Sequence, residues 1–168
     1  GGSPFRSECS GDFVVGVYIQ AGAWATAIGL KCASFNASKG RFGEPWNKAF
    51  HGAGSRDPFK TALCPGQRFV SGMRFGFTRD GSEPKYLDFV EVFCTPVSGR
   101  GETMPVSIHT GHGCWQTPPN MPGGITPHVK IHAAQVCPKG EAVKGIVGRA
   151  GSYVDAVGLI CPAGPVKR

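Results

Sequence analysis

The sequence lacks the features that would point to a membrane, nucleic-acid-binding or helical protein. No apolar run reaches the roughly 18 residues of a membrane-spanning helix. The 18 Lys and Arg residues outnumber the 11 Asp and Glu residues and give a net charge of +7, but the basic residues are scattered and never form a run. Alanine- and leucine-rich helical stretches are also missing. We therefore expect neither membrane insertion nor nucleic acid as a partner.

The motifs of common enzyme and metal sites are missing as well. The chain has no Cys-x-x-Cys pair, no nucleophile elbow and no phosphate loop followed by Lys and Ser or Thr. His109 and His112 resemble part of a metal cluster, with His128 and His132 further on, but their spacing fits no zinc site. We therefore expect no enzyme activity, no metal and no cofactor.

Glycine, proline and cysteine are abundant instead. The 26 glycines and 14 prolines suit many short strands joined by tight turns. Seven widely spaced cysteines favour disulfides, and hence an oxidising compartment. These features predict a secreted, all-β single domain over residues 1–168, either a mature form without a signal peptide or an excised piece of a larger protein.

Three segments share one order of features: a cysteine, a glycine-containing turn, a strand, a polar turn, a second strand and a second cysteine. The midpoint of each cysteine pair falls in a turn-like stretch, and residues equidistant from a hairpin turn face each other. We therefore predict three disulfides, Cys9–Cys32, Cys64–Cys94 and Cys137–Cys161. Cys114 has no partner among these three pairs. The alternatives are a buried thiol, an intermolecular disulfide, or a different pairing that includes Cys114.

A glycine-rich loop followed by proline and an aromatic or His residue precedes each of these hairpins. Three copies of loop, strand and hairpin imply three Greek-key sheets around a pseudo-threefold axis. The stretches 33–50 and 95–122 would supply the remaining strands of the first two sheets. The repeats would cover approximately 1–50, 51–122 and 123–168, with circular sharing of strands between them.

Two parts of the chain carry a family resemblance. The opening Gly1-Gly-Ser-Pro-Phe5 and the segment Gly145–Leu159 resemble the jacalin-related lectins. The cysteine frame and Gly43-Glu-Pro-Trp46 are also similar to the vitelline membrane outer-layer protein family. Both families have the β-prism I fold, so the resemblance implies three four-stranded Greek-key sheets and carbohydrate as the partner.

The resemblance also implies where a sugar would bind. Jacalin-related lectins use a Gly-x-x-x-Asp loop beside a Gly-Gly loop. The aspartate position lies six residues before the second cysteine of each hairpin and is occupied by Thr26, Asp88 and Asp155, and only the third hairpin keeps both glycine and aspartate. The implied site comprises Gly1, Gly2, Gly151, Ser152, Tyr153, Val154 and Asp155.

Several of these residues have chemistry that suits a sugar. Asp155 would accept hydrogen bonds from two sugar hydroxyls, and the backbone N–H groups of Ser152, Tyr153 and Val154 would donate. The Tyr153 ring would lie beside the apolar face of the sugar. Asp88 with Gly123 and Gly124 forms a second candidate site.

Structural roles are alternatives for several of these residues. Asp155 could cap its own backbone in a turn. Trp24, Tyr86 and Tyr153 occupy the same place in each repeat, which favours packing, and Arg149 is expected to be a solvated turn residue. A lectin-like domain is the favoured function, and a structural or adhesive coat domain or a targeting module without sugar binding is the alternative.

Overall fold

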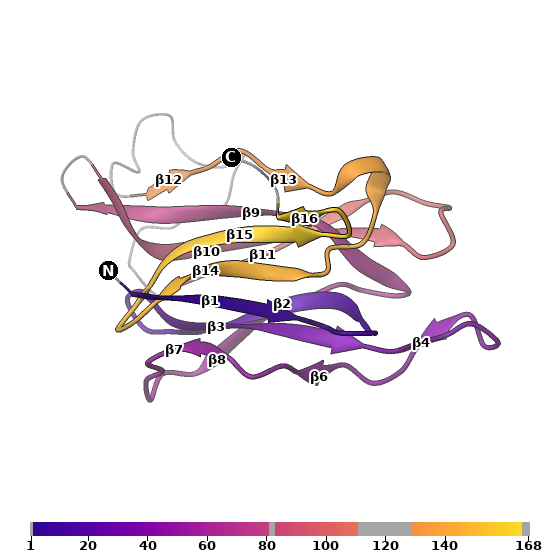
Figure 1. The fold of residues 1–168 in the computed structure, drawn as a ribbon, viewed down its shortest axis with the longest axis horizontal. Helices are drawn as coiled ribbons and strands as arrows, with labels where there is room; N and C mark the ends of the chain where they lie inside the picture. The colour runs from indigo at the N-terminus through magenta and orange to yellow at the C-terminus, as the bar shows by residue number, and fades with distance from the viewer. Residues whose placement is uncertain (1, 81–82, 111–128, 166–168) are drawn as a thin grey trace.

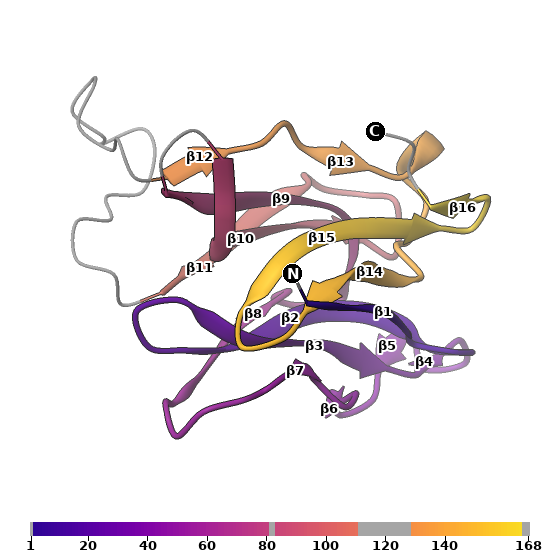
Figure 2. The ribbon, with the colours of Figure 1, turned by 60° about the vertical axis from the view of Figure 1, so that its left-hand side comes forward.

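The computed structural model describes residues 2–80, 83–110 and 129–165, and of residues 79–80, 83–85 and 164–165 it describes the backbone only. Strands dominate the described chain, and the short 3-10 turn Pro138–Gly140 interrupts them. Three antiparallel sheets surround a shared core and form the three sides of a prism (Figures 1 and 2). No helix among the described residues is long and apolar enough to cross a membrane.

The first sheet has four strand positions in the order β6-β3-β2-β8, and a further short strand, β7, also pairs with β3. Its strands are β2 (Phe13–Ala21), β3 (Ala25–Ala33), β6 (Trp46–Asn47), β7 (His51–Gly52) and β8 (Phe59–Leu63). A separate two-stranded hairpin, β4 (Phe35–Asn36) and β5 (Arg41–Phe42), extends from this sheet.

The second sheet has the order β11-β10-β9-β12, and β13 continues the outer position beside β9. Its strands are β9 (Arg68–Asp80), β10 (Glu83–Pro96), β11 (Met104–His109), β12 (Val129–Ile131) and β13 (Gln135–Val136). The third sheet has the order β1-β14-β15-β16. Its strands are β1 (Ser3–Glu8), β14 (Gly145–Ala150), β15 (Val154–Cys161) and β16 (Gly164–Pro165). Each sheet thus has the predicted four strand positions.

Strands are shared between neighbouring repeats. The strand β8 precedes the second hairpin but pairs with β2 of the first sheet, and β12 precedes the third hairpin but pairs with β9 of the second. The N-terminal strand β1 closes the circle by pairing with β14 of the third sheet. This sharing brings the start of the chain to the last hairpin, which decides where the candidate site forms.

The central hairpin strands supply most of the core, and those of the first hairpin are the most fully buried. In β2, which reads FVVGVYIQA, every residue after Phe13 is buried, and β-branched and aromatic residues suit such a position. The outer strand β8 is mostly exposed and buries only Ala62 fully. The largest fully buried side chains come from all three hairpins and include Ile19, Leu30, Phe75, Phe89, Ile146 and Leu159.

The three disulfides pair the cysteines as predicted, with Cα–Cα distances of 5.6, 5.5 and 5.5 Å. The geometric argument behind the pairing was wrong in detail. Cys32 faces Val14 in the ladder, not Cys9, and Cys94 faces Val70. The first cysteine of each pair lies before its strand, so the chain folds back over the hairpin end to reach the second cysteine.

The hairpin turns consequently lie closer to the second cysteine than the midpoints suggested. The first turn comprises residues 22–24 and the third comprises 151–153, whereas β9 of the second hairpin continues to Asp80. Arg149 therefore belongs to strand β14 and not to a turn, although its side chain is exposed as expected.

Candidate functional site

Each central hairpin contains a β-bulge at the position that the sequence singled out for a carboxylate. In the third hairpin Arg149 pairs with Ala156 and Ala150 pairs with Val154, which leaves Asp155 unpaired. The same shift leaves Thr26 unpaired in the first hairpin and Asp88 in the second. A bulge redirects the side chain of the extra residue. The three positions are therefore structurally equivalent, as the cysteine frame predicted.

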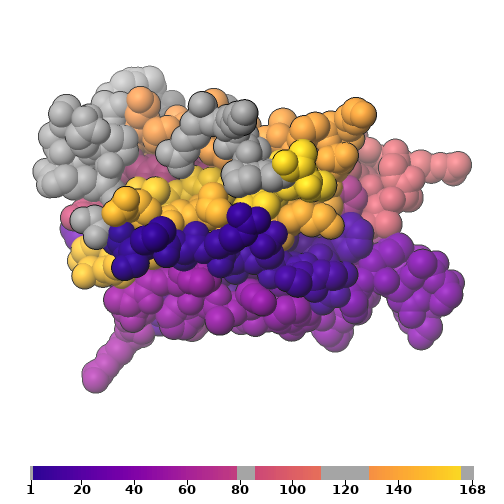
Figure 3. Space-filling view, in the orientation of Figure 1, coloured from indigo at the N-terminus to yellow at the C-terminus, as the bar shows by residue number. Residues whose placement is uncertain are grey.

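At the third hairpin the N-terminal segment meets the β14–β15 turn. The backbone N–H of Gly2 donates to Asp155 Oδ2 at 2.9 Å, and Arg149 Nε donates to the Gly2 carbonyl at 3.1 Å. The register of β1 against β14, with Ser3 opposite Ala150, produces this arrangement. Figures 1 and 2 show the N-terminus beside the β14–β15 turn, and Figure 3 shows β1 lying along the C-terminal hairpin on one surface. Gly1 lies outside the described residues.

The contact between the N-terminal segment and the third hairpin requires glycine at position 2 and leaves little space at position 151. A Cβ atom at Gly2 would lie 2.3 Å from the carbonyl carbon of Ala150 and 2.6 Å from the amide nitrogen of Gly151. A Cβ atom at Gly151 would lie 3.2 Å from the Cα of Gly2. Both glycines therefore allow the two backbone segments to approach closely.

The remaining predicted site residues differ in exposure. Ser152 is exposed and Tyr153 half-buried at the hairpin tip, whereas Val154 is fully buried and its backbone faces Ala150. Asp155 is half-buried, and its Oδ1 atom is buried without a hydrogen-bond partner among the described residues. Burial of a carboxylate oxygen that accepts no hydrogen bond is costly. At the end of the third hairpin, which we call the apex, Asp155 Oδ1 is therefore an acceptor that lacks a donor within the described part of the chain.

The three equivalent aromatic residues contact each other where the hairpins converge. The ring centroids of Tyr86 and Tyr153 are 4.6 Å apart, and Trp24 lies 5.4 Å from each of them. All three residues are half-buried. Mutual packing at the end of the prism is therefore the role that these contacts support for Tyr153.

A second loop, residues 52–57, borders the third hairpin on its other side. The N–H of Ala53 donates to the Gly151 carbonyl at 2.8 Å, and that of Gly54 donates to the Thr26 carbonyl at 3.4 Å. Gly52 has a φ of +121°, and a Cβ there would lie 2.2 Å from the Thr26 carbonyl oxygen. This loop thus joins the first and third hairpin ends into one continuous rim.

The same loop brings a carboxylate to the first hairpin, where the sequence comparison found only Thr26. A Cβ at Gly22 would lie 2.7 Å from Asp57 Oδ2, so the Asp57 carboxylate lies directly over this glycine. The buried Gln20 holds the loop by donating to the carbonyls of Ser55 and Asp57 at 2.6 and 2.9 Å. Counting positions back from the second cysteine of each hairpin could not find Asp57, because this residue belongs to the loop that precedes the next hairpin.

Asp88, the carboxylate of the second candidate site, is completely buried. Gly123 and Gly124, its predicted partners, lie outside the described residues, as does Cys114. The second site therefore stays a prediction. In the described part of the chain no three His, Cys, Asp or Glu side chains gather in a way that could hold a metal ion.

Solved structures with the same architecture are sugar-binding proteins. Calystegia sepium agglutinin is 14% identical, with a TM-score of 0.54 over 95% of this chain and 87% of its own. Artocarpin, crystallised with mannopentose, is 10% identical, with a TM-score of 0.55 over 99% and 91%. A prostate-specific WGA16 glycoprotein lectin is 12% identical, with a TM-score of 0.55 over 94% and 88%.

This chain has the β-prism fold of the jacalin-related lectins. At these identities the likeness establishes the fold alone. No protein-family model and no curated protein sequence matches the chain. The candidate site therefore has to be argued from the prism's own residues.

Burial lowers the pKa of one histidine of the prism, and this links its protonation to folding. His51, next to the 52–57 loop, stacks on Phe5 with ring centroids 4.7 Å apart, and burial lowers its pKa below the usual value of 6.5. In the window below pH 6.5 the unfolded chain binds more protons than the folded prism at this residue. Its contribution to stability is complete above pH 6.5 and is lost as the pH falls through the lowered pKa.

Urea unfolding at a series of pH values should therefore separate the parent from His51→Phe, which keeps an aromatic ring but does not titrate. We expect the free energy of unfolding of the parent to fall more steeply below pH 6.5 than that of the variant. Aspartate and glutamate titrate in both proteins, so they cancel in the difference. Parallel curves would show that His51 does not contribute to the pH dependence.

Proposed function

We propose that this β-prism is a secreted carbohydrate-binding domain whose principal sugar site lies at the end of the third hairpin. The observation that carries the proposal is the contact between Gly2 and Asp155, which joins residues 153 positions apart at a carboxylate with one unpartnered oxygen. The three disulfides are consistent with an extracellular protein and support secretion.

The chemistry of this apex suits a sugar ring. A sugar hydroxyl donates to Asp155 Oδ1, and the exposed tip at Ser152 and Tyr153 supplies backbone N–H donors to sugar oxygens. Gly2 and Gly151, which lack side chains, let the ring approach the backbone. Such a shallow site binds a monosaccharide weakly, with a Kd on the order of millimolar to tens of micromolar.

The structural neighbours indicate which sugars to test first. Artocarpin was crystallised with methyl-α-mannose as well as mannopentose, and the Calsepa lectin with a bisected glycan and a biantennary N-glycan. Mannose and branched N-glycans are therefore the first ligands, with glucose and galactose for comparison.

Titration of Asp155→Asn tests the proposal, because this change removes the charge with little change in shape. We expect the affinity for the best sugar to fall roughly 10- to 100-fold, the loss of one charge-assisted hydrogen bond. The matched control is Asp57→Asn, which removes the carboxylate of the first hairpin end and should leave the affinity unchanged.

Two results would contradict the proposed site. Unchanged binding in Asp155→Asn together with lost binding in Asp57→Asn would move the site to the first hairpin end. Absence of saturable binding to every sugar in a glycan array, by a correctly folded protein, would favour the structural or adhesive alternative.

A further inference from the structure

The hairpin formed by β4 and β5 carries a group that the proposed sugar site does not use. Its turn contains Asn36-Ala37-Ser38, and all three residues are exposed. An asparagine followed by any residue except proline and then by serine or threonine is the acceptor sequence of N-glycosylation. Asn36 is the one asparagine in the whole sequence that meets this rule. We propose that Asn36 carries an N-linked glycan.

The local geometry presents the reactive atom of this asparagine. The Ser38 hydroxyl donates to Asn36 Oδ1 at 2.7 Å, and the backbone N–H of Lys39 donates to the same oxygen at 3.0 Å. Both bonds use the amide oxygen, so Nδ2 has no partner among the described residues. Two donors on the oxygen also polarise the amide and make the Nδ2 protons more acidic. The free protein therefore already holds Ser38 against the acceptor amide.

The hairpin is anchored at its base and open at its turn. Phe35 and Phe42 pack against Phe13, with ring centroids 6.2 and 5.5 Å apart, and the Phe42 N–H donates to Gln67 Oε1 at 2.6 Å. Beyond this base, residues 36–41 are exposed. Figure 1 shows β4 projecting from the right-hand end of the molecule. A transferring enzyme can thus reach the turn of a folded or partly folded chain.

A groove next to the acceptor gives the first sugar residue a place to lie. It has a volume of about 430 Å³ and is lined by Asn36, Lys39, Arg41, Phe42, Gly43 and Glu44. Phe42 offers an apolar surface, while the charged side chains can hydrogen-bond to hydroxyls. The first sugar can therefore pack against the hairpin rather than extend freely into solvent.

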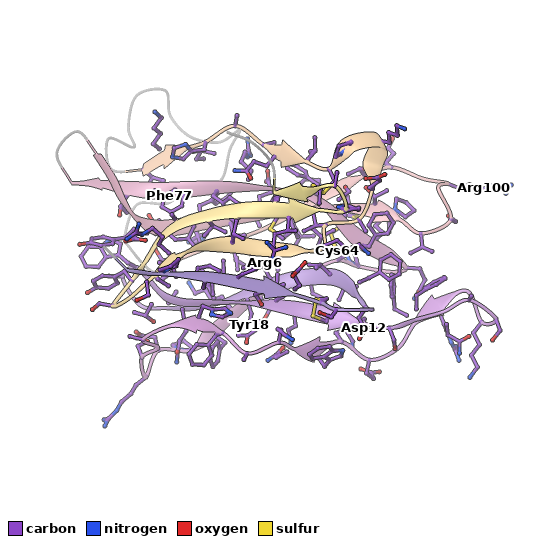
Figure 4. All side chains as sticks on the ribbon, viewed as in Figure 1. Arg6, Asp12, Tyr18, Cys64, Phe77 and Arg100 are labelled. Carbon is purple, nitrogen blue, oxygen red and sulfur yellow. A yellow bond between two sulfur atoms is a disulfide. The ribbon has the colours of Figure 1, made fainter. Side chains whose placement is uncertain are left out.

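The position and the compartment both suit this modification. Figure 1 shows β4 at the right-hand end of the molecule and the N-terminus at the left, and Asp12, beside the Phe13 anchor, lies right of the centre in the same view (Figure 4). A glycan on this hairpin therefore leaves the Gly2–Asp155 contact open. Three disulfides place the chain in an oxidising compartment, which it shares with N-glycosylation in eukaryotic secretion. The inference does not rest on the proposed sugar binding.

The reaction needs an oligosaccharide donor linked to a lipid pyrophosphate. Asn36 Nδ2 attacks the anomeric carbon of the donor's first sugar and forms a C–N bond. The bond between that carbon and the pyrophosphate oxygen breaks, the oxygen keeps the electron pair, and the lipid pyrophosphate leaves. Nδ2 loses one proton, which the departing pyrophosphate takes up, and the substitution involves no oxidation or reduction.

Secretion of the chain from a eukaryotic cell line tests the proposal. We expect the secreted protein to carry a glycan that peptide N-glycosidase removes, converting Asn36 to aspartate in the peptide mass spectrum. Asn36→Gln and Ser38→Ala should each lose the glycan, whereas Ser38→Thr should keep it because threonine has the same hydroxyl.

The outcome is decided by occupancy of Asn36 in correctly folded protein. A secreted chain with all three disulfides formed and an unmodified Asn36 peptide would overturn the proposal. A glycan that persists in Asn36→Gln would also overturn it, since the sugar would then be attached elsewhere. Sugar-binding titrations of Asn36→Gln should match those of the parent, which separates this site from the proposed lectin site.

Discussion

Replacement of both Cys64 and Cys94 by alanine is expected to lower the free energy of unfolding by about 3.5 kcal/mol. The disulfide closes a loop with a sequence separation of 30 residues, and the loss of this constraint raises the entropy of the unfolded chain. Cys94 is fully buried and Cys64 nearly so, and the pair closes the hairpin of the two longest strands, β9 and β10. The size of this effect is a large part of the total stability of an ordinary domain.

Equilibrium unfolding in urea measures this loss and identifies its origin. An effect on the unfolded state should raise the m-value, because the less constrained chain exposes more surface on unfolding. The near-ultraviolet circular dichroism of the folded variant should stay like that of the parent. A variant within about 0.5 kcal/mol of the parent would show that packing, rather than the disulfide, holds this hairpin.

Substitution of Gly2 by alanine is expected to remove sugar binding altogether. The new Cβ would collide with the backbone of Ala150 and Gly151, and a side-chain rotation cannot relieve such a contact. The N-terminus must move away, which breaks the hydrogen bond from Gly2 to Asp155 and separates the two loops of the proposed site. This change therefore affects binding more than Asp155→Asn, which leaves both loops in place.

The matched control for this variant is Ser3→Ala, at the next residue, which is the first of β1. Ser3 is exposed, so its substitution should leave both binding and stability unchanged. Gly2→Ala should cost about 1 kcal/mol of stability, the value of one hydrogen bond. Titration and urea unfolding of both variants check this. Undiminished sugar binding in Gly2→Ala would contradict a site at the Gly2–Asp155 contact.

Much of the fold could be predicted from the spacing of the cysteines. Their order and distances predicted three hairpins, their disulfides and the equivalence of Thr26, Asp88 and Asp155. The detailed register could not be predicted in this way, because the two cysteines of a pair lie at unequal distances from their hairpin turn. Val14, not Cys9, lies opposite Cys32, since the chain folds back before the strand begins.

The Asn36 acceptor was also within reach of the sequence, because a three-residue pattern marks it. What the pattern cannot show is whether the asparagine is exposed and how its amide is held. The contacts from Ser38 and Lys39 to Oδ1 and the exposed turn answer both points.

The all-β architecture, the disulfide frame and the single complete Gly-x-x-x-Asp loop could be predicted from the sequence, because they depend on local composition and spacing. Which groups meet at the hairpin ends is a property of the tertiary structure. The sharing of strands between repeats brings Gly2 to Asp155 and Asp57 to Gly22. The convergence of the three hairpins brings their aromatic residues Trp24, Tyr86 and Tyr153 into one cluster. Such contacts link residues far apart in the chain, and their positions are set by how the three sheets close around one core.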